Sequence, residues 1–121
     1  MTLCLPLPPP DLRPNSRPHW ARKAKATKAA KALARLRTLE AGLPASAPTH
    51  YRITYHWPTP RRRWDDDNCI AACKAYLDGI CAALRMDDRE MTLAGLVHDR
   101  SQPGKAGVSV EMWNSQAQPR Q

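Results

Sequence analysis

The sequence has no hydrophobic run long enough to cross a membrane, no pair of cysteines in a C-x-x-C arrangement, and no internal repeat. A membrane helix needs about 18 consecutive apolar residues, so we expect no membrane partner. The N-terminal stretch MTLCLPLPPP also lacks the basic segment and the long apolar segment of a signal peptide. We therefore expect a cytoplasmic protein.

The cysteines do not have the spacing of a disulfide framework or of a zinc motif. Cys69, Cys73 and Cys81 fall within one predicted helix, where bridges between neighbouring turns have poor geometry. A zinc site built from Cys69, Cys73 and His98 matches no common ligand spacing. We interpret these three cysteines, together with Cys4, as reduced and mostly buried small hydrophobic residues.

Acidic residues are absent between positions 13 and 37, a stretch rich in lysine and arginine. The whole chain carries a net charge of +8 at pH 7 and has a pI of about 9.8. Nucleic acid is the commonest partner of so basic a domain, with an anionic membrane or a ribosome surface as alternatives. A bound polyanion would relieve the repulsion between these cations, although a solvated helix face is also compatible with them. The cations are Arg13, Arg17, Arg22, Lys23, Lys25, Lys28, Lys31, Arg35 and Arg37.

The rest of the pattern predicts a small α+β domain. Hydrophobic residues make up 42% and charged residues 25% of the 121 positions, which is typical of one globular unit. We expect a small mixed sheet with two main helices packed on it, in the order β-α-β-α-β-β. This single domain would span residues 1–113, and a disordered tail would follow at 114–121. The expected strands lie at 3–7, 51–57, 91–99 and 107–113, and the expected helices at 19–41 and 67–85.

The second predicted helix combines an apolar stripe with a polar one. Asp67, Lys74 and Asp78 fall within a narrow angular band beside the apolar stripe. Gly79 weakens the helix but permits close packing against a neighbour. The apolar stripe consists of Ile70, Cys73, Leu77, Cys81 and Leu84.

Three consecutive aspartates stand at the start of this helix, in the segment RRRWDDDN. In an extended chain Asp65 and Asp67 point the same way, so they can converge, while Asp66 points away and is the expected helix cap. Capping alone would explain such a run. However, a cap needs one aspartate, and a second pair, Asp87 and Asp88, follows the helix. Clustered carboxylates also bind Mg²⁺, which can activate a water against a phosphodiester, so a metal site is the alternative interpretation.

The ordered set of motifs resembles the RusA family of Holliday junction resolvases, endonucleases of bacteria and their phages. RRRWDDDN resembles the family's basic run followed by D-x-D-N, and Lys74 to Asp78 matches a K-x-x-x-D in the next helix. The pair Asp87 and Asp88 and two predicted strands follow in the family's order. LPLPPPDLRPNSR resembles the family's opening strand and loop. The resemblance spans most of the chain, from about residue 3 to residue 112, and implies a RusA-like fold.

The resemblance implies a set of catalytic residues as well. Asp65, Asp67 and Asp88 would form a magnesium site, and Lys74 would be the catalytic lysine. In the family member compared, that lysine comes four residues after the second aspartate, where this chain has Ala71. Lys74 lies seven residues after Asp67, on the same expected helix face one turn further along, and is the lysine that matches this role.

The resemblance also implies a function and a partner. The protein would be a homodimer in a bacterial host cell that makes paired nicks in four-way DNA junctions during recombination and repair. A DNA-binding structural module without catalysis and a nuclease for other branched DNA are the alternatives. The expected DNA contacts are Arg61, Arg62, Arg63, Asn15, Arg17 and Lys105.

Each aromatic residue near these motifs is compatible with two roles. Trp64, between the arginines and the aspartates, suits either base stacking or packing. His19 and Trp20 open the basic helix and could stack on bases, but we expect Trp20 to pack in the core. We expect His98 to be a surface residue or a hydrogen-bonded structural residue rather than a ligand.

Overall fold

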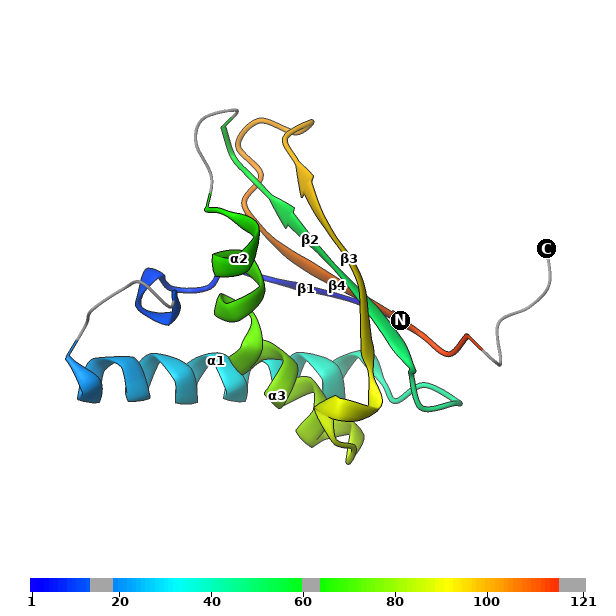
Figure 1. Cartoon of the computed structure of the whole chain (residues 1–121). Coiled ribbons are helices and arrows are strands. Elements are labelled where there is room, and N and C mark those ends of the chain that lie inside the picture. Colours follow the sequence, from blue (N-terminus) through cyan, green and yellow to red (C-terminus); the bar gives the residue numbers. More distant parts are fainter. Residues whose placement is uncertain (14–18, 60–63, 116–121) are drawn as a thin grey trace.

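A four-stranded mixed sheet with helices along one face makes up the protein (Figure 1). The computed structural model describes residues 1–13, 19–59 and 64–115. Its strands are β1 (Thr2–Leu5), β2 (His50–His56), β3 (Thr92–Asp99) and β4 (Gly107–Trp113). Its helices are α1 (Trp20–Ala41), α2 (Asp66–Ala72) and α3 (Lys74–Leu84), and single 3-10 turns η1 (Pro10–Leu12) and η2 (Asp88–Glu90) join them.

The strands lie in the order β1-β4-β2-β3. β4 is antiparallel to both β1 and β2, whereas β3 is parallel to β2. The parallel pair requires a crossover, and α2 and α3 supply it. Alternating residues of β2, which are Tyr51, Ile53 and Tyr55, are buried under these helices. The predicted α+β class, the mixed sheet and the order of its elements are therefore confirmed.

Helix α1 touches the rest of the molecule through a narrow stripe of small residues. Its buried residues are Ala30, Ala34 and Thr38. α3 approaches this stripe so closely that a Cβ added to Gly79 would lie 2.2 Å from the backbone oxygen of Lys31. The close packing expected at Gly79 is therefore present. Figure 1 shows α1 running across the end of the helical layer, with α3 crossing it.

The predicted helix over 67–85 is in fact two helices that meet at Cys73. The Cys73 amide donates to the Ile70 carbonyl, three residues back, in place of the four-residue bond of an α-helix. The Cys69 carbonyl accepts instead from the buried hydroxyl of Tyr55, at 2.7 Å. A tertiary hydrogen bond from the sheet thus coincides with the break, which no local propensity signals.

The apolar stripe predicted for this segment is partly wrong. Ile70 is 36% exposed, and Leu77 and Leu84 are only partly buried. α3 packs against α1 as well as the sheet, so its buried face is wider than the predicted stripe and turned towards α1. The fully buried positions of α2 and α3 include Cys69, Ala72, Cys73, Tyr76, Ile80, Cys81 and Ala83.

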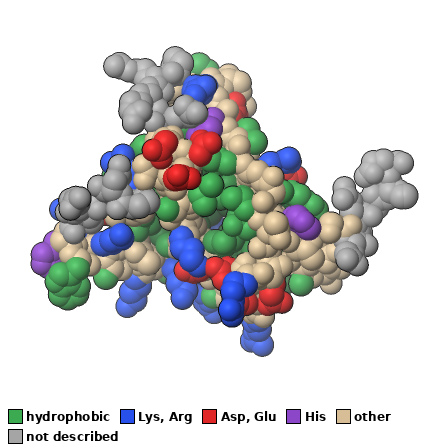
Figure 2. All heavy atoms as spheres, in the orientation of Figure 1, with side chains coloured by type: hydrophobic (Ala, Val, Ile, Leu, Met, Phe, Trp, Pro, Cys, Tyr) green, Lys and Arg blue, Asp and Glu red, His purple; other side chains and the backbone are tan. Residues whose placement is uncertain are grey.

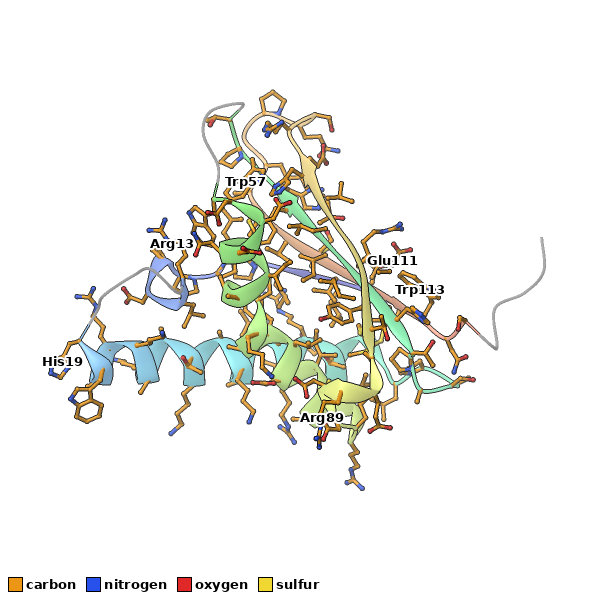
Figure 3. The ribbon with its side chains drawn as sticks, viewed as in Figure 1. Arg13, His19, Trp57, Arg89, Glu111 and Trp113 are labelled. Atoms are coloured by element: carbon orange, nitrogen blue, oxygen red, sulfur yellow. The ribbon has the colours of Figure 1, made fainter. Side chains whose placement is uncertain are left out.

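The cysteines match their prediction, but Trp20 does not. None of the four cysteines forms a disulfide bond, and Cys69, Cys73 and Cys81 are buried while Cys4 is exposed. Trp20 is 77% exposed, so the expected core packing is wrong. Burial in α1 begins at Ala26 and Ala30, which leaves the first turns of the helix beyond the packed layer. Figure 3 shows His19 at that projecting end, far from the sheet.

The residues that follow β4 are hydrogen-bonded to the segment that leads into β2. Asn114 Nδ2 donates to the Ala47 carbonyl at 2.7 Å, and the Ser115 amide donates to Thr49 Oγ1 at 3.1 Å. These two residues belong to the predicted tail, and residues 116–121 lie outside the described part.

No helix within the described ranges is long and apolar enough to span a membrane.

Candidate functional site

The helix cap at the aspartate run is Asp65. Its backbone is extended, and its Oδ1 accepts a hydrogen bond from the Asn68 amide at 3.0 Å. The expectation that Asp66 is the cap is wrong, because Asp66 is the first helical residue. A cap must have a non-helical backbone and reach the amide of the third helical residue, and only Asp65 does so here.

Asp66 instead takes part in a relay with two residues of the sheet. Trp57 Nε1 donates to His98 Nδ1 at 2.9 Å, and His98 Nε2 lies 2.8 Å from Asp66 Oδ1. An indole N–H can only donate, so Nδ1 of His98 must be the acceptor and Nε2 carries the proton. Of the two roles expected for His98, the hydrogen-bonded one is therefore the one observed.

An aromatic cluster supports the start of α2. Trp57 stacks on Tyr55 with ring centroids 5.2 Å apart, and Trp64 meets Trp57 edge-on at 6.0 Å. Trp64 is therefore partly packed on the core, the second of its two predicted roles. The guanidinium of Arg13 lies 4.9 Å from the centre of the Trp64 ring, and its Nε is buried without a hydrogen-bond partner in the described part of the chain.

Lys74 joins the polar stripe of α3 to the distant aspartate pair. Its Nζ lies 2.8 Å from Asp78 Oδ1 and 2.5 Å from Asp88 Oδ2. The hydrogen bonds that Lys74 donates to Asp78 and Asp88 hold the pKa of its ammonium above the ordinary value. The structure thus brings together Lys74 and Asp88, two of the residues predicted for catalysis.

The turn η2 holds Asp88 in place. Asp87 accepts from the Arg89 amide at 2.9 Å, and its own amide donates to Glu90 at 2.8 Å, which completes a capping box. The Arg89 side chain and amide hold the pKa of Asp87 well below its usual range. Asp87 therefore has a structural role beside its neighbour Asp88.

The three predicted magnesium ligands lie in two groups. Asp65 and Asp67 are exposed at the start of α2, while Asp88 pairs with Lys74 at the start of α3. Figure 2 shows acidic side chains gathered in two places on this face, with a hydrophobic surface beside them. In the described ranges, no three His, Cys, Asp or Glu side chains are close enough to hold a metal ion. The carboxylate chemistry nevertheless suits Mg²⁺, which often takes only one or two protein ligands.

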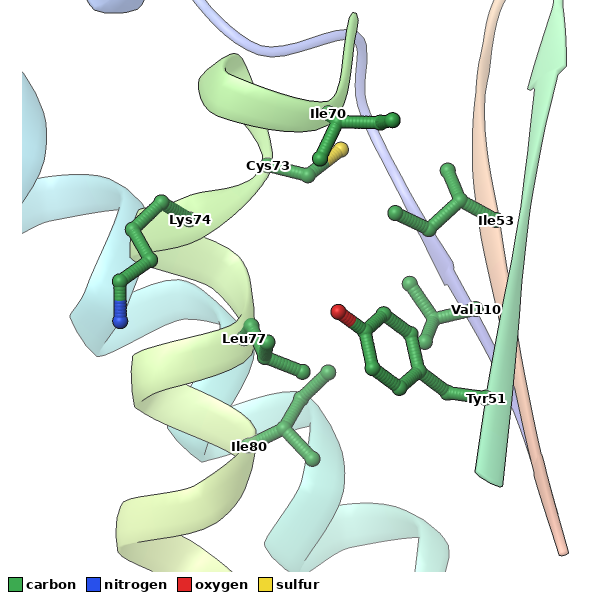
Figure 4. Close-up of a pocket in the computed structure, with 8 residues that line it drawn as sticks. All are labelled: Tyr51, Ile53, Ile70, Cys73, Lys74, Leu77, Ile80 and Val110. Carbon is green, nitrogen blue, oxygen red and sulfur yellow. The ribbon is translucent and has the colours of Figure 1, made fainter. Parts of the chain in front are cut away.

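A small hydrophobic groove beside these groups was missed by sequence reasoning. It has a volume of about 70 Å³ and separates α2 and α3 from the sheet. In Figure 4 the Tyr51 hydroxyl points across it towards α3, while the amino group of Lys74 points away from it. Ile70 and Leu77 lie seven residues apart in the sequence, a helical repeat that could have indicated this wall. The lining residues are Tyr51, Ile53, Ile70, Cys73, Lys74, Leu77, Ile80 and Val110.

Most of the residues predicted to contact DNA lie outside the described part of the chain. They are Asn15, Arg17, Arg61, Arg62 and Arg63. Lys105 is exposed in the turn between β3 and β4. The Gly104 amide donates to the Pro58 carbonyl at 2.9 Å, so this turn lies alongside the residues that directly follow β2.

Helix α1 presents cations that have no acidic partner in the described part of the chain. Arg22 pairs with Asp11 at 3.2 Å, and Arg37 donates to the Cys4 carbonyl at 3.2 Å. The other cations of the helix form no ion pair with any described residue. They are Lys23, Lys25, Lys28, Lys31 and Arg35, all exposed.

Fold and site together define a small α+β protein that carries acidic clusters and a lysine on one face and a basic helix beside them. No family model matches the chain. It is 41% identical over 103 residues to a protein of Xylella fastidiosa (strain Temecula1) whose printed name is "Uncharacterized protein". The match covers 81% of this chain and 67% of the Xylella protein. The chain belongs to the same family as this bacterial protein.

Proposed function

We propose that the protein is a Mg²⁺-dependent endonuclease of the RusA type that resolves four-way DNA junctions in the bacterial cytoplasm. The observation that carries the proposal is the contact between Lys74, at the start of α3, and Asp88 in η2. A lysine held among carboxylates balances their charge at rest and can meet a phosphate when DNA binds. The unpaired cations of α1 support attraction of the DNA backbone.

Each residue has a role in this proposal. Asp65 and Asp67 would hold Mg²⁺, with Asp88 able to join them when Lys74 is drawn away by a phosphate. A bound Mg²⁺ supplies a water of lowered pKa and polarises the phosphodiester. Lys74 would stabilise the negative charge that develops on the phosphate. Two sites related by the two-fold axis of a homodimer would suit paired nicks in a nearly symmetric junction.

A DNA-binding module without catalysis is the second candidate, and the hydrogen bonds of the carboxylates favour it. Asp65 caps α2, Asp66 contacts His98, and Asp88 pairs with Lys74. Each of these contacts is a sufficient structural reason for its carboxylate. Asp67 has no such contact with a described residue, so its function separates the two candidates.

The test is a nicking assay on a synthetic four-way junction with Mg²⁺, comparing the wild type with Asp67→Asn. We expect the wild type to cut and Asp67→Asn to be slower by more than about 100-fold, because even outer partners of a catalytic metal contribute about 10- to 100-fold. The matched control is Asp66→Asn, which removes one charge from the same cluster and keeps an oxygen for His98. This control should retain cutting.

The outcomes distinguish the candidates. A wild type that binds the junction but never cuts it excludes the enzyme and leaves the DNA-binding module. Equal loss in both variants would mean that Asp67 acts only through the charge of the cluster. Flap and duplex substrates run in parallel identify a nuclease for other branched DNA if the flap is cut and the junction is not.

A further inference from the structure

A second groove lies on the other side of the α2–α3 segment, where η1 and the N-terminal half of α1 meet it. It has a volume of about 250 Å³. Figure 1 shows η1 beside α2, above the projecting half of α1. Three alanines form its helical wall, so small side chains leave the space open one turn beyond Asp67. The lining residues are Leu12, Lys23, Thr27, Ala71, Ala72, Lys74 and Ala75.

Among the described residues that line this groove, the charged ones are two lysines from different elements. Lys23 comes from α1 and Lys74 from the first turn of α3. None of the lining residues is acidic. Lys74 is neutralised by Asp78 and Asp88, whereas Lys23 forms no ion pair within the described ranges. An uncompensated cation facing a hollow beside a second cation is a favourable environment for an anion.

We propose that this groove binds a backbone phosphate of DNA, with Lys23 as the cation that anchors it. The inference rests on the proposed function for its ligand and adds a binding residue and a place for the phosphate. A water molecule occupies about 30 Å³ of liquid, so the groove has room for a phosphate with its ester oxygens. The phosphate competes with Asp78 and Asp88 for Lys74. Seating the DNA therefore frees the Asp88 carboxylate from its ion pair with Lys74.

Two contacts within the protein hold Lys23 in a fixed position at the groove, as expected for a binding site for a single phosphate. The ion pair between Arg22 and Asp11, at 3.2 Å, ties η1 to the start of α1, so Leu12 and Lys23 keep their separation across the groove. Thr27 Oγ1 donates to the Lys23 carbonyl at 2.9 Å and fixes the turn that carries Lys23. The cation is thus on a supported element, which lowers the entropy lost on binding.

The test measures DNA binding in EDTA, so it does not depend on cutting. Dissociation constants for a fluorescent four-way junction and for a duplex are measured between 50 and 200 mM NaCl, for the wild type and Lys23→Ala. We expect Lys23→Ala to weaken binding of both DNAs and to reduce the slope of log K against log salt by about 1, the effect of losing one phosphate contact. The comparison variant Lys25→Ala removes the same charge from the same helix outside the groove, and its slope should change by much less.

A second variant approaches the groove from its opposite wall. Ala71→Glu places a carboxylate in the wall of the groove that Lys23 and Lys74 also line, on an exposed helical position that tolerates glutamate. It should weaken binding more than Lys23→Ala does. The helical circular dichroism of each variant shows that it is folded.

The proposal is overturned if Lys23→Ala and Lys25→Ala have equal effects, because the helix would then act only through its overall charge. It is also overturned if Ala71→Glu binds DNA as the wild type does. A protein that shows the Lys23-specific slope change but never cuts a junction keeps the phosphate groove and loses the proposed catalysis. The two proposals therefore fail separately.

Discussion

At the scale of single residues, the Tyr55 hydroxyl is a clear case of a buried polar group with a defined task. The Tyr55 side chain is completely buried, and its hydroxyl donates to the Cys69 carbonyl at 2.7 Å. Burial raises the pKa of this hydroxyl, so it stays protonated as a donor. The bond holds the end of α2 against β2 at the point where α2 gives way to α3.

Replacing this tyrosine by phenylalanine should destabilise the fold. Tyr55→Phe keeps the ring that stacks on Trp57 and removes the buried hydrogen bond, so we expect the free energy of unfolding to fall by about 1 to 2 kcal/mol. Urea unfolding would show a lower midpoint with an unchanged slope. Tyr51→Phe is the matched control, since the Tyr51 hydroxyl has no hydrogen bond to any described residue, and it should change stability by less than about 0.5 kcal/mol. If Tyr55→Phe and Tyr51→Phe lower the free energy of unfolding equally, the loss comes from ring packing and not from the hydrogen bond to Cys69.

The aspartate run shows how far residue roles could be predicted. D-D-D-N indicates that a cap is present, but which aspartate caps depends on a helix start defined to within one residue, and sequence patterns are not that accurate. The contact of Asp66 with His98 joins residues 32 positions apart, so no local signal exists for it. The pairing of Lys74 with Asp78 follows from their i,i+4 spacing in a helix, so it could be predicted from the sequence.

At the scale of elements, the approach of α1 to α3 depends on one glycine. A Cβ at Gly79 would lie 2.2 Å from the Lys31 carbonyl oxygen and 3.0 Å from the Ala34 Cβ. The carbonyl belongs to the backbone of α1, which cannot yield locally, so the two helices would have to separate.

Gly79→Ala should therefore destabilise the protein although alanine favours helices. The gain in helix propensity is about 1 kcal/mol, and overpacking by a backbone clash typically exceeds it. We expect a net loss of about 2 kcal/mol in the free energy of unfolding, measured by chemical denaturation. Gly95→Ala is the control: its Cβ would meet nothing within 4 Å, and stability should hold within about 0.5 kcal/mol. A stabilised Gly79→Ala protein would contradict this packing.

The elements themselves were largely predictable, and the exceptions have tertiary causes. The strand in β2 follows from strict alternation of apolar and polar residues, and α1 from its helix formers and the stop at Gly42. The break at Cys73 and the exposed Trp20 were not predictable. The first coincides with a hydrogen bond from the sheet, and the second depends on how far α1 extends beyond its neighbours.

At the scale of the whole molecule, a polar network joins three strands at one end of the sheet and affects acid stability. His56 on β2 lies 3.1 Å from Asp99 on β3 and 2.7 Å from Ser109 on β4. Hydrogen bonds from the Ser101 hydroxyl and amide, followed by His56, lower the pKa of Asp99 to about 2. A carboxyl whose pKa is lower in the folded state stabilises the fold above its unfolded pKa of about 4, and loses that contribution as the pH falls towards 2.

The stability advantage of wild type over Asp99→Asn should consequently be constant near neutral pH and shrink between about pH 4 and pH 2. Protonated Asp99 resembles asparagine, so the two urea midpoints should converge at the acid end. Ser101→Ala, which removes the largest cause of the lowered pKa, should give part of the same difference. Midpoints that stay parallel from pH 7 to pH 2 would exclude Asp99 as a source of the acid sensitivity.

The strand order could not have been read from the sequence. Alternation predicts β1 and β4 individually, but their pairing joins Leu3 to Val110, and no short-range pattern specifies it. The hydrophobic groove beside Tyr51 and the phosphate groove beside Lys23 have the same origin, because each is lined by residues from three or more elements.

The position of β4 between β1 and β2 also has a consequence for synthesis on the ribosome. The strand made first, β1, pairs only with β4, the last strand of the sheet to be made. Until residue 113 has emerged, the backbone of β1 has no strand to pair with, and its N–H and C=O groups lack their sheet partners. The nascent chain can form α1 early, but its sheet must close late and through contacts of long sequence separation.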